Sequence, residues 1–167
     1  MKTYPLPELL TVVILFAVFA LFHVECVPKA EASFDSDALI LSRAVVSEAG
    51  YSPGQETFAL LHVLQYRRDN MPALRHMSLA QVAVRYCSEL NGRARTARAA
   101  QTRRLTSRDI PDAIKRDVRS WLHGERPANI CEGATDWGSP AYVRAQGLRA
   151  IRCDVPTQNA FVRRGAR

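Results

Sequence analysis

Apolar residues recur at helical spacing through much of the chain after its N-terminal apolar segment. Leu41, Ala44 and Val45 lie at the i, i+3, i+4 positions that form one face of a helix, so the pattern predicts a first helix from about residue 37 to residue 49. Gly50 follows directly, and glycine is a typical helix end because it adopts the conformation of a C-terminal cap without strain.

Two further helices are predicted by their start signals. For the second helix, Ser52 can cap the first turn, Pro53 suits the first helical position and Gln55 completes a capping box. This helix is expected to continue to about residue 68. The third helix begins with another capping box, at residues 78–81, and is expected to end at Gly92.

A fourth helix is predicted in "IPDAIKRDVRSWLHG", and an irregular segment follows it. The inward positions of this helix are apolar: Ile110, Ile114, Val118, Trp121 and Leu122. Beyond Glu125, Gly, Pro and Asn interrupt every apolar run, and only "AIRC" and "NAFVRR" are strand candidates. The predicted fold class is mainly α, with a core of about four helices and an irregular C-terminal part that contains a small hairpin.

The N-terminal segment, residues 1–32, has the pattern of an export signal. Lys2 precedes an apolar run of about 14 residues, and Ala30 and Ala32 supply the small residues of a cleavage site. Because a membrane-spanning helix needs roughly 20 residues, cleavage after Ala32 is the preferred interpretation, and an uncleaved membrane anchor is the alternative. In both cases one domain, residues 33–167, is expected to be exported to the periplasm, the cell wall or the medium.

Basic residues are concentrated in the segment from Arg93 to Arg108. Loss of the leader would raise the net charge from +7 to +8, because the leader carries two lysines and three glutamates. The segment contains six arginines and no acid: Arg93, Arg95, Arg98, Arg103, Arg104 and Arg108. A cationic surface of this kind attracts anionic polymers, which for an exported protein are those of the cell wall. Nucleic acid is an alternative partner, although no aromatic residue interleaves with the arginines to stack on bases, and a solvated surface loop is the simplest interpretation.

The cysteines are consistent with export to an oxidising compartment. Cys87 follows Ala83 by one turn on the apolar face of the third helix, where a buried thiol behaves as a small hydrophobic group. We therefore expect Cys131 to pair with Cys153, with free thiols as the alternative. The histidines show no ligand spacing with the cysteines, so no metal site is expected.

Glu48 occupies a position that the first helix reserves for an apolar residue. On a helical wheel it falls between Leu41 and Ala44, away from the polar stripe that includes Arg43 and Ser47. A carboxyl group that faces the interior or a cleft has a raised pKa, and an acid that is still protonated near neutral pH can deliver a proton to a leaving oxygen. The alternative is a structural role, in which Glu48 accepts hydrogen bonds from the amides near Gly54 or forms an ion pair with an arginine.

Two stretches of the chain resemble the spore-cortex-lytic family of cell-wall hydrolases, which are lysozyme-like proteins. The first stretch has a glutamate at a helix end, a turn, Gly-Gln and an apolar helix. The matching residues are Glu48, Ala49, Gly54, Gln55, Val63 and Arg67. Tyr66 stands where the family usually has Asn. The second stretch is "GATDW", residues 133–137, followed by the closing strand "NAFVRR".

The resemblance implies a lysozyme-like α(+β) fold and cleavage of peptidoglycan glycan strands, with Glu48 as catalytic acid and base and no cofactor. Family members of this type are lytic transglycosylases: the acid protonates the bond between N-acetylmuramic acid and N-acetylglucosamine, and the muramyl 6-hydroxyl attacks internally. Hydrolysis by a muramidase needs a second carboxylate. Asp136 is the better candidate for it, because the helix dipole already accounts for Glu56.

Four residues are candidates for substrate binding, and each has a structural alternative. Trp137 and Tyr142 can stack on sugar rings or anchor a loop to the core. His62 lies on a semi-polar line of the second helix and can face the cleft or pack inside the protein. Gln55 can cap the helix, bind substrate, or do both.

Two non-enzymatic functions remain open from the sequence. One is a catalytically inactive cationic protein that binds the cell wall through the Arg93 to Arg108 segment, which the Tyr66 departure favours. The other is an exported nucleic-acid-binding protein. Attachment to the membrane through the N-terminal segment is compatible with all of these functions.

Overall fold

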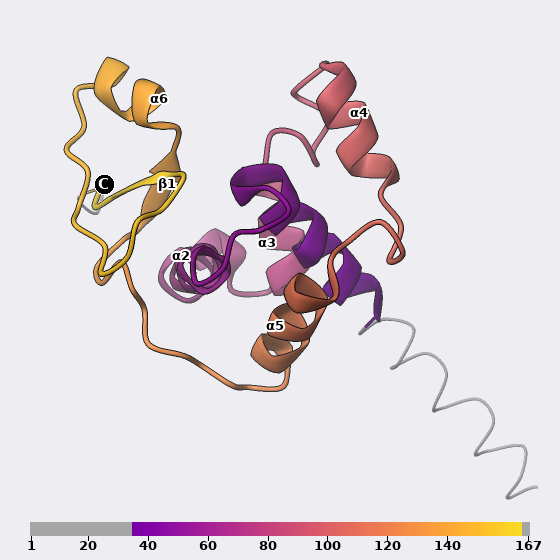
Figure 1. The fold of residues 1–167 in the computed structure, drawn as a ribbon. Helices are drawn as coiled ribbons and strands as arrows, with labels where there is room; N and C mark the ends of the chain where they lie inside the picture. Colours follow the sequence, from indigo (N-terminus) through magenta and orange to yellow (C-terminus); the bar gives the residue numbers. More distant parts are fainter. Residues whose placement is uncertain (1–34, 165–167) are drawn as a thin grey trace, which may run out of the picture. The chain divides into compact units, whose positions relative to one another are not determined.

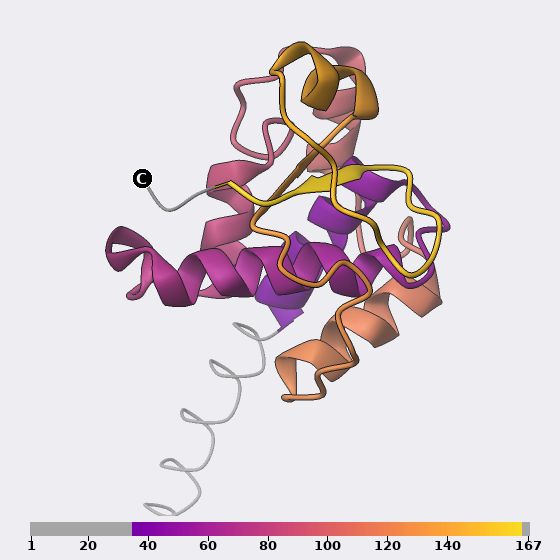
Figure 2. The same ribbon diagram turned by 90° about the vertical axis from the view of Figure 1, so that its left-hand side faces the viewer.

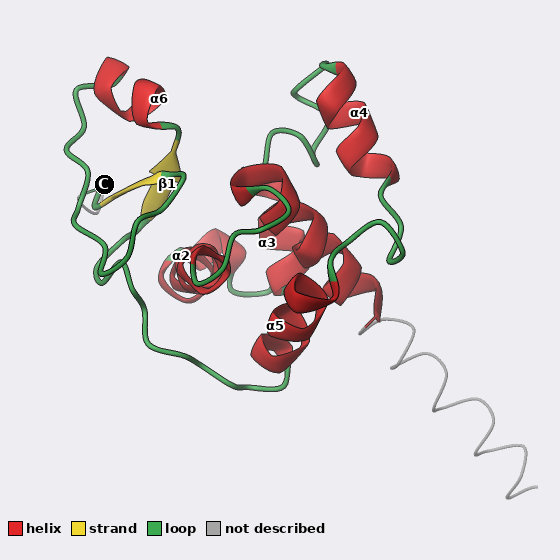
Figure 3. Ribbon diagram, in the orientation of Figure 1, coloured by secondary structure: helices red, strands yellow, loops and turns green. Residues whose placement is uncertain are grey.

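The computed structural model describes residues 35–164, and the predicted leader, residues 1–32, lies outside them. The described residues from 37 onward belong to one compact unit. This part is mainly helical with one two-stranded sheet (Figures 1 and 3), which confirms the predicted fold class. No helix within residues 35–164 has both the length and the hydropathy of a membrane span.

The helices enclose one hydrophobic core. They are the first helix (residues 35–49), α2 (Glu56–Asn70), α3 (Leu79–Tyr86), α4 (Ala97–Arg104), α5 (Asp112–Leu122) and α6 (Pro140–Ala145), with a 3-10 turn η1 (Pro72–Leu74) after α2. Helix α2, seen end-on in Figure 1 and along its length in Figure 2, packs against α3 and α5. The large buried side chains include Leu41, Leu60, Leu61, Leu64, Val82, Val118, Trp121 and Phe161. Burial of each such side chain contributes roughly 1.5–3 kcal/mol to folding.

Helix α2 begins later than its capping signals predict. Pro53 accepts the amide of Glu56 at 3.1 Å, and Gly54 has a positive φ of 54°, so these residues form a turn instead of a first helical turn. Gln55 takes the N-cap position but makes no side-chain capping hydrogen bond. The predicted capping box at Ser52 to Gln55 is therefore wrong, because the Pro-Gly turn delays the helix.

Helix α3 begins as predicted but ends early. The Ser78 hydroxyl accepts the amide of Gln81 at 3.3 Å, and the Gln81 side chain accepts the amide of Ser78 at 2.8 Å, which confirms the capping box. At the other end, Cys87 has an extended backbone (φ −84°, ψ 108°), and its carbonyl accepts the amide of Asn91 in a turn. The helix therefore ends before residue 92, and Glu89 lies in the turn that follows it.

The arginine segment is not simply a solvated loop, because it contains helix α4. The Thr96 hydroxyl caps this helix by accepting the amide of Ala99 at 3.1 Å. Ala99 and Thr102 are buried, whereas Arg93, Arg95, Arg98, Arg104 and Arg108 are exposed. An isolated polar helix of eight residues is marginal in water, so the contacts of α4 with the rest of the fold account for its presence.

The C-terminal part contains a sheet that the sequence predicts only in part. Strand β1 (Asp136–Gly138) pairs antiparallel with β2 (Ala160–Val162), so that Trp137 lies opposite Phe161. The "NAFVRR" strand is confirmed, but "AIRC" contributes only an isolated bridge from Ala150 to Val162. The expected hairpin is thus replaced by two strands that are distant in sequence, with α6 between them.

A disulfide joins Cys131 to Cys153, which confirms the predicted pair. It connects the segment before β1 to the segment before β2. Cys87 is free and buried, also as predicted.

Candidate functional site around Glu48

Glu48 lies near the C-terminal end of the first helix and meets a residue from the distant sheet. The indole Nε1–H of Trp137, on β1, donates to Glu48 Oε2 at 2.9 Å. The Asn159 side-chain amide donates to the backbone carbonyl of Glu48 at 2.7 Å. Glu48 is half-buried, and its carboxyl group accepts from Trp137 instead of from the amides near Gly54. The first helix and the sheet thus both fix the position of this carboxyl group.

The surroundings of Glu48 favour its neutral form. Burial raises the pKa of Glu48 above the ordinary value of 4.5, because a charged carboxylate loses hydration there. Hydrogen bonds from Trp137 and from the Cys87 thiol lower the pKa, the negative charge of Glu89 raises it, and the positive charge of Arg98 lowers it. The net result is a raised pKa, so the Glu48 carboxyl retains its proton at higher pH than a free glutamic acid.

The hydrogen bond from Trp137 also holds the Glu48 carboxyl group in place. An indole N–H is only a donor, so Oε2 is the acceptor in this contact. The site therefore both favours the protonated form of Glu48 and fixes the orientation of its carboxyl group.

Trp137 is better placed to position Glu48 than to stack on a sugar. Its side chain is only 8% exposed, and its single polar group is used by Glu48. The guanidinium of Arg67, on α2, lies 4.9 Å from the Trp137 ring centroid and 4.1 Å from that of Tyr86. Such cation–π contacts contribute more when the cation is desolvated, as Arg67 is here.

Asp136 is engaged in ion pairs. It is bound by the guanidinium of Arg67 and lies 2.5 Å from Nε of Arg164. One of its oxygens also accepts the backbone amide of Trp137 at 2.9 Å. These contacts hold Arg67 and the start of β1 in place, and they leave Asp136 poorly suited to the role of second carboxylate.

His62 and Gln55, two other candidates for substrate binding, make no hydrogen bond to Glu48 among those of residues 35–164. Nε2 of His62 lies 2.8 Å from the carbonyl oxygen of Pro127, and its ring packs edge-on against Trp121 with 4.7 Å between centroids. This is the packing role that the sequence left open for His62. Gln55 is exposed at the N-cap of α2 and forms no side-chain cap.

Tyr142 is a predicted site residue that is open to solvent. It is 47% exposed, and its ring lies over Gly138, where an added Cβ would come within 2.8 Å of Cδ1 of Tyr142. Helix α6 therefore brings an aromatic face next to strand β1. Among the hydrogen bonds of residues 35–164, none joins Tyr142 to Glu48.

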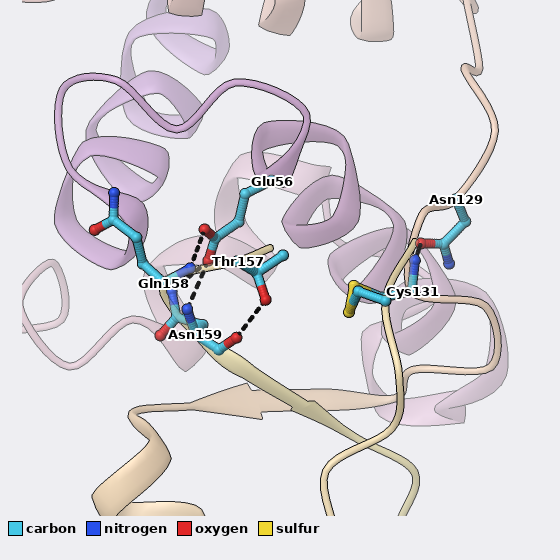
Figure 4. The surroundings of a disulfide bond; sticks show 7 residues. Glu56, Asn129, Cys131, Thr157, Gln158 and Asn159 are labelled. Atoms are coloured by element: carbon cyan, nitrogen blue, oxygen red, sulfur yellow. Dashed lines mark hydrogen bonds between the residues drawn. A yellow bond between two sulfur atoms is a disulfide. The ribbon is translucent and has the colours of Figure 1, made fainter. Parts of the chain in front are cut away.

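Glu56, which the sequence analysis explained by the helix dipole, holds the loop at residues 158–159 in place through hydrogen bonds. It is 2% exposed and accepts the backbone amides of Gln158 and Asn159 at 2.7 and 2.9 Å (Figure 4). The Asn159 side chain also donates to Glu56, at 2.9 Å, while it holds the Glu48 carbonyl. Glu56 thereby fixes the loop that supports the backbone of Glu48.

Arg67, Glu56 and Asn159 are site residues to which the sequence assigned no role in the site. Arg67 and Asn159 lie in the resembling motifs, and Glu56 was considered as a second carboxylate and set aside. The side chains of Glu56 and Asn159 meet across 103 positions of sequence, which no local pattern reveals. Within residues 35–164, no group of three or more His, Cys, Asp or Glu side chains is arranged to hold a metal ion.

Comparisons with known proteins returned no match: no family model, no curated protein and no solved structure matches this chain. The interpretation of the site therefore depends on the geometry of Glu48 and on the resemblance of the sequence motifs.

Proposed function

We propose that this protein is an exported enzyme that cleaves peptidoglycan glycan strands, with Glu48 as the general acid. One observation carries the proposal: Glu48 is half-buried, has a raised pKa and is held by the Trp137 indole N–H at 2.9 Å. A retained proton on a carboxyl group that is held in place is what protonation of a glycosidic oxygen requires. The motifs around Glu48 and Trp137 resemble those of the spore-cortex-lytic hydrolases, which supports the same chemistry.

The proposed reaction begins with transfer of the Glu48 carboxyl proton to the oxygen that links N-acetylmuramic acid to the next sugar. The bond between the anomeric carbon and this oxygen breaks, the oxygen keeps the electron pair, and positive charge develops on the muramyl ring. The muramyl 6-hydroxyl then attacks the anomeric carbon and returns a proton to the Glu48 carboxylate. The products are a 1,6-anhydro sugar and a free 4-hydroxyl group, so the reaction consumes no water.

A muramidase reaction differs only in the second step, where water attacks in place of the 6-hydroxyl. Inverting and retaining hydrolases both use a second carboxylate for this step. Asp136, the candidate from the sequence, is bound to Arg67 and Arg164. Because both arginines already bind Asp136, we favour a lytic transglycosylase reaction over a hydrolysis in which Asp136 is the second carboxylate.

Digestion of purified sacculi by the wild-type protein and by Glu48→Gln tests the proposal. Wild-type protein should release anhydromuropeptides, identified by mass spectrometry, and E48Q should release none while keeping the circular dichroism spectrum and melting temperature of the wild type. Reducing-end products would identify a muramidase. Equal release by E48Q would reject Glu48 as the acid.

A second candidate function is binding of anionic wall polymers without catalysis, favoured by the exposed arginines on and around α4. In this case wild-type protein should pellet with sacculi, and added salt should release it because exposed charges are screened. Pelleting without digestion would support the inactive wall-binding protein. One chain can carry out both proposed functions. In that case the arginines would attach the protein to the wall polymers, and Glu48 would cleave the glycan strand.

A further inference from the structure

A second carboxylate, Glu89, lies beside the segment that carries Glu48. The hydroxyl of Ser47, the residue before Glu48, donates to Glu89 Oε2 at 2.8 Å. The hydroxyl of Thr102, on α4, donates to the same oxygen at 3.2 Å. Nε of Arg98 lies 3.5 Å from Glu89 Oε1. Three elements, the first helix, the turn after α3 and α4, thus meet at this side chain.

The position of Glu89 follows from the early end of α3. Because Cys87 leaves the helical conformation, the chain turns and directs Glu89 toward the first helix. The turn is itself fixed, since the Arg103 guanidinium donates to the backbone carbonyl of Glu89 at 2.6 Å. Glu89 is therefore held through its backbone and through both carboxylate oxygens.

Glu48 is surrounded by a small set of charged and titratable groups. The Cys87 thiol approaches from the end of α3, Glu89 from the following turn and Arg98 from α4, while the sheet contributes the neutral indole of Trp137. Asp136 and Arg67 lie behind Trp137 and neutralise each other. Glu89 is the acidic group of this set whose negative charge raises the pKa of Glu48.

The partners of Glu89 leave it a more effective negative charge than Asp136. Asp136 is paired with two arginines, of which Arg67 is buried. Glu89 is paired with one arginine, Arg98, whose side chain is 68% exposed, so water screens that pair. The Glu89 and Asp136 side chains are similarly exposed, at 19% and 16%, so the difference between the two charges lies in their partners.

We propose that Glu89, and not Asp136, is the second carboxylate of the Glu48 site, and that it stabilises the positive charge that develops on the muramyl ring as the glycosidic bond breaks. This inference rests on the proposed function. A fixed charge directed at a site of developing charge is a major source of rate enhancement, because it is in place before the reaction begins. Glu89 itself forms no bond to substrate and exchanges no proton.

The test compares Glu89→Gln, Glu89→Asp and the exposed control Glu125→Gln in the full chain. Glutamine retains an oxygen that accepts from Ser47 and Thr102 but lacks the charge. E89Q should lower the turnover rate on sacculi on the order of 100-fold, with little change in KM and in melting temperature. E89D keeps the charge and should recover much of the rate, and Glu125→Gln should equal wild type.

The pH profile separates electrostatic action from a merely structural role. Cleavage by a general acid falls as pH rises through the pKa of Glu48, and loss of the Glu89 charge lowers that pKa. The alkaline limb of the E89Q profile should therefore move to lower pH, while that of E89D should not. Wild-type rate and an unmoved limb in E89Q, with active wild-type protein, would overturn the role of Glu89 and leave the proposed function standing. Inactive wild-type protein would overturn both.

Discussion

Glu48 and Glu56 are eight positions apart in the sequence, yet the structure gives them opposite surroundings. Glu56 is 2% exposed and accepts two backbone amides and one side-chain amide. Glu48 is half-buried and receives one N–H donor, from Trp137, and a weaker thiol donor, from Cys87. A carboxylate with a full set of strong donors is a structural anchor, whereas a partly desolvated carboxyl with few donors is available for proton transfer. The hydrogen-bond partners, more than burial alone, distinguish the surroundings of the two carboxyl groups.

The largest expected effect is on stability and comes from the anchor. Glu56→Ala would leave the buried backbone and side-chain amides of Asn159, and the part-buried amide of Gln158, without their acceptor. Each unsatisfied buried donor costs about 1–3 kcal/mol. The free energy of unfolding in urea should fall by about 3 kcal/mol or more. The exposed control Glu125→Ala should stay within about 0.5 kcal/mol of wild type. A loss below about 1 kcal/mol in Glu56→Ala would contradict its role as an anchor.

The disulfide is expected to have a comparable effect in the same part of the fold. Cys131 and Cys153 are 22 positions apart, and closing a loop of this size stabilises a protein by about 3 kcal/mol in the chain-entropy model. The double variant with serine at both positions should therefore melt at a lower temperature than wild type. Reductant should lower the melting temperature of the wild type but leave the double variant unchanged.

Trp137→Phe sharpens the comparison from the side of Glu48. Phenylalanine keeps an aromatic ring beside Arg67 but removes the N–H that donates to Oε2. Because this hydrogen bond lowers the pKa of Glu48, its loss should raise that pKa further and move the alkaline limb of the activity profile to higher pH. Turnover should fall about tenfold, since the net value of such a hydrogen bond is about 1–1.5 kcal/mol. Unchanged turnover and an unmoved profile would show that Trp137 does not position the acid.

The smallest expected effect is a dependence of stability on pH. The pKa of Glu48 is raised in the folded state, so between the ordinary value of 4.5 and the folded-state pKa the native protein binds more protons than the unfolded chain. The contribution of Glu48 to the free energy of unfolding is therefore complete below pH 4.5 and is lost as pH rises through the folded-state pKa. Glu48→Gln should remove this decline. An identical pH dependence in wild type and E48Q would contradict a raised pKa.

Local patterns predict the parts of this fold that are amphipathic or carry caps. The first helix, α3 and α5 have apolar faces or a capping box that appear as expected, and the Cys131–Cys153 pair is also predicted. Helix α4 was missed because it has no apolar face of its own. Its arginines and the segment around it cover the polar stripe of the first helix: Arg98 donates to the carbonyl of Ser47, and Arg43 donates to that of Leu105. The polar stripe of the first helix is in this way partly covered by a polar interface.

The candidate site is harder to predict because its contacts join distant segments. The unusual place of Glu48 on the first helix is visible in the sequence, but the hydrogen bond from Trp137 spans 89 positions and that from Asn159 spans 111. The sequence left two roles open for Trp137, stacking on a sugar ring or anchoring a loop to the core. Its burial and its N–H partner give it a different place in the structure.

Titration of Glu48 by carbon NMR tests the central claim most directly. Protein labelled with ¹³C at the glutamate side chains would be compared with E48Q, so that the Glu48 carboxyl signal is assigned by its absence. We predict a titration midpoint above 4.5, the ordinary value for glutamate. A midpoint at or below 4.5 would mean that Glu48 is an ordinary ionised carboxylate and would contradict its role as the proton donor.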